Sequence, residues 1–437
     1  MKRILLPLAL ATLVTVGLNI GVSPAQPARP RAVRVAIVTF YSGSGTVTGV
    51  PEANFAKMKI DEINKAGGVG GVPIEAQYVD EGGGPAKNVT QFRTLATQHF
   101  DAVIGYISSG DCLAVAPVAD ELHQLTIFSS CAADTLFEGH NYQYVFRTIP
   151  PTSAPTVAGV LYLLTVDPSV KTIAGINPDY AYGRDAWKYF TEAVHSFRPD
   201  VKPVGDLWPQ LFSGKYSDEI SRLLALHPDV IYSVLWGGDL VAFIQQANAQ
   251  GLFKQSKVMF GTVNEAGLTG LKALPDGVIG GSSNTYLFHP GPILQPRIKQ
   301  LIEAYRSSFG EDPVDMYAYP IQNSFAVLQA AYGKAMSQNG GKWPTTEELT
   351  KVIVGLHLNT VFGPLEMRPD HNATYHEQIG VSVHVSQYPF AVFNQVVEFP
   401  AEMIMAPVGT TPEAWIATLT PSYLSKVPKP FTYTVSR

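Results

Sequence analysis

The chain has 437 residues, of which 46% are hydrophobic and 15% are charged, with 31 Lys plus Arg against 36 Asp plus Glu. The apolar fraction excludes a disordered chain, and the near balance of charge disfavours a protein that binds nucleic acid through counterion release. Only two cysteines are present, which excludes a disulfide-built scaffold and a cysteine-rich zinc protein.

The N-terminus predicts export. Lys2 and Arg3 precede an apolar run over residues 4–20, and Val22-Ser-Pro-Ala25 supplies small residues after it. This order is typical of a secretory signal peptide, here over residues 1–25 with cleavage near Ala25, and it predicts a periplasmic protein. The alternative is an N-terminal membrane anchor, but the run is short and contains polar residues. No later stretch approaches the roughly 20 apolar residues of a membrane-spanning helix.

After a linker that ends at Arg31, short apolar runs alternate with amphipathic patterns over the first part of the chain. We predict strands at 33–40, 72–79, 102–105 and 125–129, and helices at 51–65, 85–99 and 112–123. The rhythm resumes after Thr148 with helices at 153–164, 184–196, 217–226 and 239–249 and strands at 171–176, 201–207, 230–234 and 257–260. The fold class is therefore α/β, with two doubly wound Rossmann-like lobes whose parallel sheets are covered on both faces.

The regular alternation of predicted strands and helices ends in the last part of the chain. Further helices are expected at 293–309, 321–336 and 346–354, followed by β-rich segments at 380–385 and 390–397. Residues 399–437 contain six prolines and are expected to form an extended strap over the surface.

The two cysteines, Cys112 and Cys131, are close in sequence. An oxidising compartment and an even cysteine count favour a disulfide between them over two buried free thiols. Such a bond would stabilise the fold by about 3 kcal/mol in the chain-entropy model.

Ligands of open α/β sheets bind at the carboxyl ends of the strands, which selects the loops that follow them. Ser108 and Ser109 precede a predicted helix, and hydroxyls beside a helix N-terminus suit a small anion such as a carboxylate. Plain helix capping is the alternative for this loop alone. Aromatic residues recur near the strand ends of both lobes: Tyr41, Tyr106, Tyr180, Tyr182, Trp236, Tyr317 and Tyr319. Single aromatics are often core residues, so it is their recurrence that favours a binding site.

Catalytic patterns are absent from the sequence, which contains no G-x-S-x-G, P-loop, H-E-x-x-H or C-x-x-C motif. The Gly67–Gly71 run closes a helix and precedes a strand, the reverse of a dinucleotide loop, so it is a turn. His371, His376 and Glu377 are too loosely spaced to favour a metal site over a solvated turn. We therefore expect no enzyme, no cofactor and no metal.

Several landmarks resemble one family. Ile63-Asn-Lys-Ala-Gly-Gly68, Asp80-Glu-Gly-Gly-Gly-Pro-Ala-Lys87, Tyr182-Gly183 and Phe362-Gly-Pro364 follow one another in the order typical of type I periplasmic binding proteins. The nearest group is the leucine/isoleucine/valine-binding family of ABC-importer receptors, and the resemblance covers residues 33–398.

The resemblance implies two lobes joined by three crossovers near Thr148, Ser282–Thr285 and Val361–Gly363. The first lobe would contain residues 33–148 plus 283–361, and the second residues 149–282 plus 362–398, with the strap outside both. Ligand would bind between the lobes and be trapped by hinge closure.

The ligand-binding residues expected from these loops and this resemblance lie in both lobes. They are Tyr41, Tyr106, Ser108, Ser109, Cys131, Ala132, Ala133, Tyr182, Trp236, Asn264, Glu265 and Tyr317. The serine and Cys131–Ala133 loops would hold the ligand carboxylate, and Tyr182, Trp236 and Tyr317 would form an aromatic wall.

Departures from the family bear on the ligand. Amino-acid receptors of this family hold the ammonium with acids at two places, but Ile149–Pro155 contains none here and Glu265 is displaced by about two positions. Burying the ammonium group of a ligand without a counter-charge is unfavourable by roughly several kcal/mol. The Ser108–Ala114 segment, paired with a later cysteine, also resembles a subgroup that takes up aromatic carboxylates. An aromatic or other hydrophobic carboxylate is therefore expected.

The alternatives are a receptor for branched-chain or other hydrophobic amino acids and a ligand sensor that serves a regulator or chemoreceptor. The expected partners are the small carboxylate and ABC permease subunits in the inner membrane, with the receptor itself a monomer.

Overall fold

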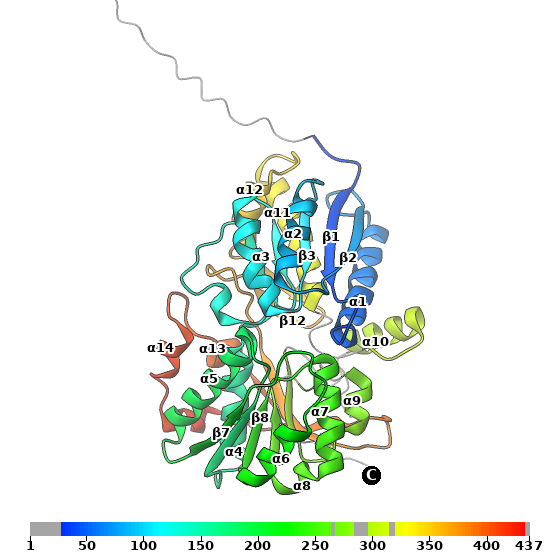
Figure 1. The fold of residues 1–437 in the computed structure, drawn as a ribbon. Helices are drawn as coiled ribbons and strands as arrows, with labels where there is room; N and C mark the ends of the chain where they lie inside the picture. The colour runs from blue at the N-terminus through cyan, green and yellow to red at the C-terminus, as the bar shows by residue number, and fades with distance from the viewer. Residues whose placement is uncertain (1–27, 262, 264–266, 284–295, 314–319, 433–437) are drawn as a thin grey trace, which may run out of the picture.

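The computed structural model describes residues 28–432 of the chain, except 262, 264–266, 284–295 and 314–319. These residues form two α/β lobes, with the first at the top of Figure 1 and the second below it. The central strands of both sheets are apolar and buried along their whole length rather than alternating, because helices cover both faces of a parallel sheet.

The first lobe is built on a five-stranded parallel sheet in the order β2-β1-β3-β4-β5. Its strands are β1 (Val33–Thr39), β2 (Ile74–Asp80), β3 (Ala102–Gly105), β4 (Thr126–Phe128) and β5 (Val145–Arg147). Its helices are α1 (Thr46–Lys65), α2 (Pro85–Ala96), α3 (Ser109–Glu121), α10 (Pro296–Phe309), α11 (Pro320–Gln338) and α12 (Thr346–Ile353), with a 3-10 turn at Asp134–Leu136.

The second lobe contains a seven-stranded sheet in the order β14-β13-β10-β9-β8-β6-β7, in which β13 runs antiparallel to both of its neighbours. Its strands are β6 (Thr172–Ile176), β7 (Lys202–Leu207), β8 (Val230–Ser233), β9 (Lys257–Phe260), β10 (Ile279–Ser283), β13 (Glu377–Val383) and β14 (Val392–Phe399). Its helices are α4 (Ser153–Val166), α5 (Ala181–Phe197), α6 (Ser217–Leu226), α7 (Gly237–Gln250), α8 (Leu252–Gln255) and α9 (Gly267–Ala273).

Several helices begin earlier than their sequences predict, and two of these starts, in α1 and α3, lie near the lobe interface. Helix α1 begins at Thr46 rather than Pro51, and its extra turn packs at Gly49, where a Cβ would lie 2.2 Å from the Phe40 carbonyl oxygen. Helix α3 begins at Ser109 rather than Cys112. The close approach of Gly49 to Phe40 accompanies the early start of α1, which the local sequence signal does not predict.

Elements of the two lobes alternate along the chain: α4 of the second lobe follows β5 of the first, and α10 of the first lobe follows β10 of the second. A further crossover is predicted near Val361–Gly363. In the structure, β12 (Gly363–Glu366) pairs with β11 (His357–Thr360), and Asn372 bridges to Arg147 of the first sheet. The structure therefore places residues 363–373 beside the first lobe, and the chain enters the second sheet at β13.

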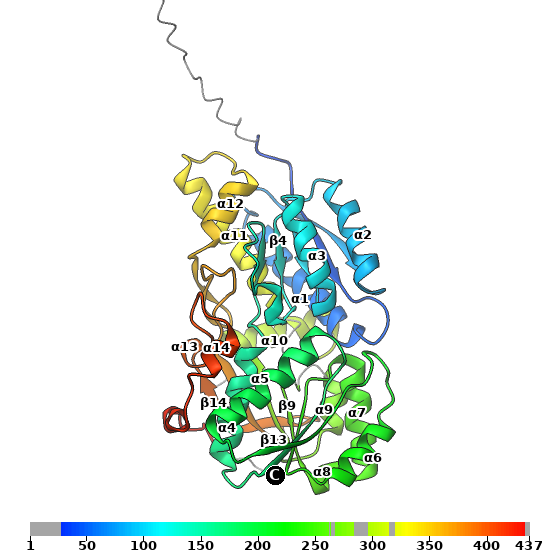
Figure 2. The same cartoon turned by 60° about the vertical axis from the view of Figure 1, so that its left-hand side comes forward.

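The C-terminal segment is not the extended strap that its prolines suggest. It contains two short helices, α13 (Ala401–Ile404) and α14 (Pro412–Ile416), followed by a 3-10 helix over Pro421–Lys426. Met403, Ile404, Trp415 and Ile416 are buried in the same core as α4 and α5, and Figure 2 shows the segment against these helices. Apolar residues between the prolines thus make it part of the second lobe. Among the described residues, no helix has the length and apolar character needed to cross a membrane.

Candidate functional site

A small cavity lies between the lobes at the carboxyl ends of strands from both sheets. Ile107, Ser109, Ser130 and Ala132 line it from the first lobe, and Tyr180, Tyr182 and Trp236 line it from the second. Its free space of about 10 Å³ is roughly that of one water molecule. The lobes are thus closed on one another, and a larger ligand enters only if they part or if the lining side chains move.

Ser109 offers a hydrogen-bond donor on the first-lobe wall. It is the first residue of α3, and its hydroxyl oxygen accepts the Ala133 N–H at 3.2 Å, which leaves its own proton for another acceptor. No side chain caps the N-terminus of α3 within the described residues. The positive end of the helix dipole adds to this donor, so the wall suits an anionic or acceptor group of a ligand.

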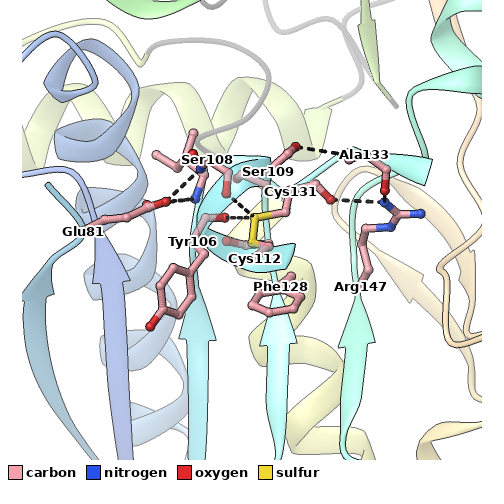
Figure 3. The surroundings of a disulfide bond; sticks show 12 residues. Glu81, Tyr106, Ser108, Ser109, Cys112, Phe128, Cys131, Ala133 and Arg147 are labelled. Carbon is pink, nitrogen blue, oxygen red and sulfur yellow. Dashed lines mark hydrogen bonds between the residues drawn. A yellow bond between two sulfur atoms is a disulfide. The ribbon is translucent and has the colours of Figure 1, made fainter. Parts of the chain in front are cut away.

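Glu81 occupies the neighbouring backbone donors. Its buried carboxylate accepts the N–H groups of Ile107 at 2.9 Å and Ser108 at 2.8 Å. Figure 3 shows Glu81 beside Ser108. Burial, and after it the charge of Asp111, raises the pKa of Glu81 well above its usual value. The Ser108 N–H is therefore already bonded to Glu81 and does not face a ligand. Ser108 supports the loop and does not line the cavity.

The second-lobe wall is aromatic and ordered by hydrogen bonding. Trp236, which precedes α7, is 2% exposed, and its Nε1–H donates to the Tyr180 hydroxyl at 3.0 Å. The rings of Tyr180 and Tyr182 pack edge-on with centroids 6.2 Å apart. Such a wall buries the face of a flat apolar ligand and positions it by ring contacts.

Phe40 extends this aromatic cluster across the lobe boundary. It follows β1 of the first lobe, yet its ring centroid lies 5.9 Å from both Trp236 and Phe212 of the second lobe. Phe212 and Trp236 are themselves 4.9 Å apart. The cluster packs the two lobes together directly beside the cavity.

Polar contacts hold the lobes together on both sides of the Ser109 loop. Beside β1, the Gly238 N–H donates to the Ser44 carbonyl at 3.0 Å, and Gly237 has a φ of +57° at a place where a Cβ would lie 2.9 Å from that oxygen. Beside β4, Asp185 of α5 accepts the Asp134 N–H at 3.1 Å. Since β1 and β4 flank β3 in the sheet, these contacts bracket the cavity.

The predicted disulfide between Cys112 and Cys131 is confirmed, with Cα atoms 6.4 Å apart. Both cysteines are fully buried, and the bond joins α3 to the loop over residues 129–133 (Figure 3). Both segments contribute lining residues to the cavity, so the disulfide restrains the first-lobe wall as well as the fold.

Replacing both cysteines with alanine is expected to lower the free energy of unfolding by about 3 kcal/mol, because the closed loop no longer restricts the unfolded chain. Urea denaturation of the oxidised protein and of the variant measures the difference. Reductant should destabilise the wild-type protein once it is unfolded and leave the variant unchanged. Equal stability of the two proteins would contradict the prediction.

The remaining predicted site residues lie away from the cavity or outside the described part of the chain. Tyr41 is 40% exposed and packs edge-on against Tyr78. Tyr106 is fully buried against Phe128, and Figure 3 shows its ring directed away from the serine loop. Cys131 and Ala133 shape the loop without lining the cavity, while Asn264, Glu265 and Tyr317 lie outside the described residues.

Sequence reasoning missed Ile107 and Ser130, which line the cavity, and Phe40, which packs beside it. It also missed Glu52 of α1, whose carboxylate accepts the hydroxyls of Ser129 and Ser130. Ser130 lies in the loop after β4. The rule that ligands bind at the carboxyl ends of the strands selects this loop, so the sequence did contain a signal for Ser130. Phe40 and Glu52 follow ordinary strand and helix patterns, and nothing local distinguishes them from core residues.

A wider groove of about 640 Å³ lies elsewhere, beside the hinge. It is lined by residues 134, 137–143, 147, 151, 153, 350, 351, 354, 368–372, 405, 406 and 408–412. Its two arginines are engaged by the protein, since Arg147 donates to Asn372 and Arg368 donates to the Ala406 carbonyl. We therefore place the candidate site at the interlobe cavity, where polar and aromatic groups from strand ends converge.

Within the described residues, no group of three or more His, Cys, Asp or Glu side chains is arranged to hold a metal ion. His371 lies with its Nδ1 2.9 Å from the Val145 carbonyl oxygen and stacks on Phe146. Burial lowers the pKa of His371 and of His376. These histidines are packed into the fold near the hinge.

Comparison of sequences identifies relatives along most of the chain. The family model for periplasmic binding proteins matches residues 32–383. The leucine-specific-binding protein of Salmonella typhimurium is 24% identical over 351 residues, which cover 79% of this chain and 89% of that protein. A Leu/Ile/Val-binding protein homologue of Brucella suis is 26% identical over 322 residues, covering 68% of this chain and 76% of that one.

Solved structures share the fold. An ABC-transporter solute-binding protein from Rhodopseudomonas palustris, in complex with 3,4-dihydroxybenzoic acid, superposes with a TM-score of 0.73 at 20% identity, over 87% of this chain and 100% of that one. Another from R. palustris, in complex with benzoate, gives 0.70 at 19% identity over 83% and 95% of the two chains. The predicted fold class, two α/β lobes, is confirmed.

Proposed function

Because the chain belongs to the periplasmic binding protein family, we propose that it captures a small aromatic or hydrophobic carboxylate between its lobes for an ABC importer. The observation that carries the proposal is the composition of the cavity. Ser109 and the start of α3 offer donors on one wall, and Tyr180, Tyr182 and Trp236 offer ring surfaces on the other.

The described lining residues also argue against an ordinary amino acid as the ligand. None of them carries a carboxylate that would pair with an ammonium group. An unpaired buried ammonium is strongly unfavourable, whereas a ligand with a carboxylate and an apolar ring meets a complementary group on each wall.

Capture is a shift between open and closed forms. A ligand that contacts Ser109 in one lobe and Trp236 in the other binds the closed form better than the open form and therefore raises its population. The Ser44–Gly238 and Asp134–Asp185 contacts form in that same closed arrangement. Closure would present both lobe surfaces together to permease subunits at the outer face of the inner membrane, with the receptor acting as a monomer.

A thermal-shift screen of the purified protein tests the proposal with benzoate, 4-hydroxybenzoate, cinnamate, leucine and phenylalanine. A ligand that binds only the folded state raises the stability of that state by RT ln(1 + [L]/Kd). We therefore expect the aromatic acids to raise the melting temperature and the amino acids to leave it unchanged. A shift with leucine or phenylalanine alone would overturn the proposal.

The second candidate function is binding of branched-chain or other hydrophobic amino acids. It is favoured by the similarity to the leucine-specific-binding protein of Salmonella typhimurium. This function requires an acid for the ligand ammonium, and Glu265 is the residue we would assign to it. Loss of leucine binding in Glu265→Gln, without loss of stability, would support this second function.

A further inference from the structure

Helix α5 of the second lobe contacts the first lobe through acidic side chains. The Asp185 carboxylate accepts the Asp134 N–H at 3.1 Å and lies 3.5 Å from the Thr135 hydroxyl. One turn further along α5, the Tyr189 hydroxyl donates to Glu138 at 3.1 Å. All three contacts join α5 to residues 134–138 of the first lobe, so an opening of the lobes that separates the two segments breaks them.

The first-lobe segment in these contacts continues the wall of the cavity. Ala132 lines the cavity, and Asp134 follows it closely in the chain. The Asp134 carboxylate accepts the N–H of Ser153 at 2.9 Å and its hydroxyl at 2.7 Å, at the start of α4. A ligand that draws the lobes together at the cavity therefore also brings α5 onto this segment.

The closed arrangement buries two carboxyl groups from opposite lobes beside each other, since Asp134 is 4% and Asp185 is 7% exposed. Burial raises the pKa of Asp134 to about 7 and that of Asp185 to about 6. The charge of Asp185 adds to the first shift, and the charge of Glu138 adds to the second. A hydrated aspartate has a pKa of about 3.9, so the closed form binds more protons than an open, hydrated form between about pH 4 and pH 7.

The cations near these two acids also bind other groups. Arg147 lowers the pKa of the first-lobe acid, and its guanidinium donates to Asn372 at 2.8 Å. Lys188 lowers the pKa of the acid on its own helix and pairs with Glu413 of α14. Neither cation offsets the effect of burial, since the pKa values of both acids remain raised.

The charges on the other elements packed against α5 act on other groups. Helix α4 contains no charged residue. Lys426 of the C-terminal 3-10 helix lies over the Tyr423 ring. The acids of α3 act on groups of the first lobe, namely Asp111 on Glu81, Asp120 on the Tyr144 N–H and Glu121 on Arg93.

We propose that closure of the lobes takes up a proton at the contact between Asp134 and Asp185, so that ligand capture is coupled to proton binding. The inference rests on the proposed function, because it assigns proton uptake to the same closure that traps the ligand. By linkage, the affinity for a ligand that stays ionised falls as the pH rises. The receptor would hold its ligand more tightly at acidic pH and release it more readily at neutral pH.

Isothermal titration with the aromatic acid that gives the largest thermal shift tests the inference. Titrations at pH 5.5, 6 and 7.5, each in two buffers of different ionisation enthalpy, measure both the affinity and the protons taken up. With the pKa of Asp185 at about 6 in the closed form, the wild-type protein should take up about 0.5 proton or more per ligand at pH 6. It should bind about 4-fold or more tightly at pH 5.5 than at pH 7.5.

Asp185→Asn removes the titrating group and keeps an oxygen that accepts the Asp134 N–H. This variant should take up about a third fewer protons or less than that, and it should bind the ligand more tightly than the wild-type protein at pH 7.5. Tyr189→Phe is the matched control, because it removes a hydrogen bond between the lobes and leaves both aspartates in place. It should weaken binding by a similar factor at every pH and keep the proton uptake.

A wild-type affinity independent of pH, with no proton uptake, would overturn the inference and leave the proposed function standing. Unchanged proton uptake in Asp185→Asn would also overturn it, since the protons would then bind elsewhere. Failure of every aromatic acid to bind would overturn the proposed function. If leucine binds instead, the same titrations with leucine decide the inference.

Discussion

Trp236→Ala is expected to weaken the binding of an aromatic carboxylate by about 30-fold or more. Trp236 is 2% exposed, lines the cavity and is oriented by its hydrogen bond to Tyr180. Truncating a buried aromatic anchor at a binding site costs about 2 kcal/mol or more, and each 1.4 kcal/mol is a tenfold change in affinity. Isothermal titration with the acid that gives the largest thermal shift measures the loss.

Trp208→Ala is the control for that experiment. Trp208 belongs to the same lobe and packs under the Arg184 guanidinium, 3.7 Å from its ring centroid, but it does not line the cavity. The Trp208→Ala variant should therefore bind the ligand with the same affinity as the wild-type protein. Unchanged affinity in Trp236→Ala, with its melting temperature preserved, would show that the interlobe cavity is not the binding site.

The stability of the protein should fall as the pH rises from about 4.5 to about 7, and Glu52 should account for about 3 kcal/mol of that fall. The pKa of Glu52 is raised by burial from 4.5 to about 7 in the folded protein. The folded state therefore binds more protons than the unfolded state in this range, so the free energy of unfolding decreases with pH and levels off above about 7. One unit of pKa shift corresponds to about 1.4 kcal/mol.

Urea denaturation at pH 5, 6, 7 and 8 measures this dependence in the wild-type protein and in Glu52→Gln. The variant should lose the part of the fall that Glu52 causes and keep the rest, because burial also raises the pKa of Asp134 to about 7 and that of Asp185 to about 6. Glu62→Gln on the same helix is the control, since Glu62 is exposed and pairs with Lys59. Parallel curves for the wild-type protein and Glu52→Gln would contradict the assignment.

Much of the architecture follows from local sequence. The strands β3 and β9 and the helix α6 occupy the predicted residues, because buried apolar runs and helical periodicity are properties of neighbouring residues. The Cys112–Cys131 bond was likewise predictable, from compartment and an even cysteine count. The strand-end rule also selected the loops that supply Ser109, Ala132, Tyr182 and Trp236 to the cavity.

The sequence by itself determined the fold class, the alternation of elements and the loops from which a site would be built. Only the tertiary structure decided which residues meet: Phe40 crosses to the second lobe, Glu52 reaches the serine loop from α1, and Tyr106 turns into the core. It also decided that residues 363–373 lie beside the first lobe, where Asn372 bridges to Arg147, and that the C-terminal segment packs into the second lobe. The physical reason is that periodicity shows which face of an element is buried, whereas its partner across that face is set by sheet order and lobe closure.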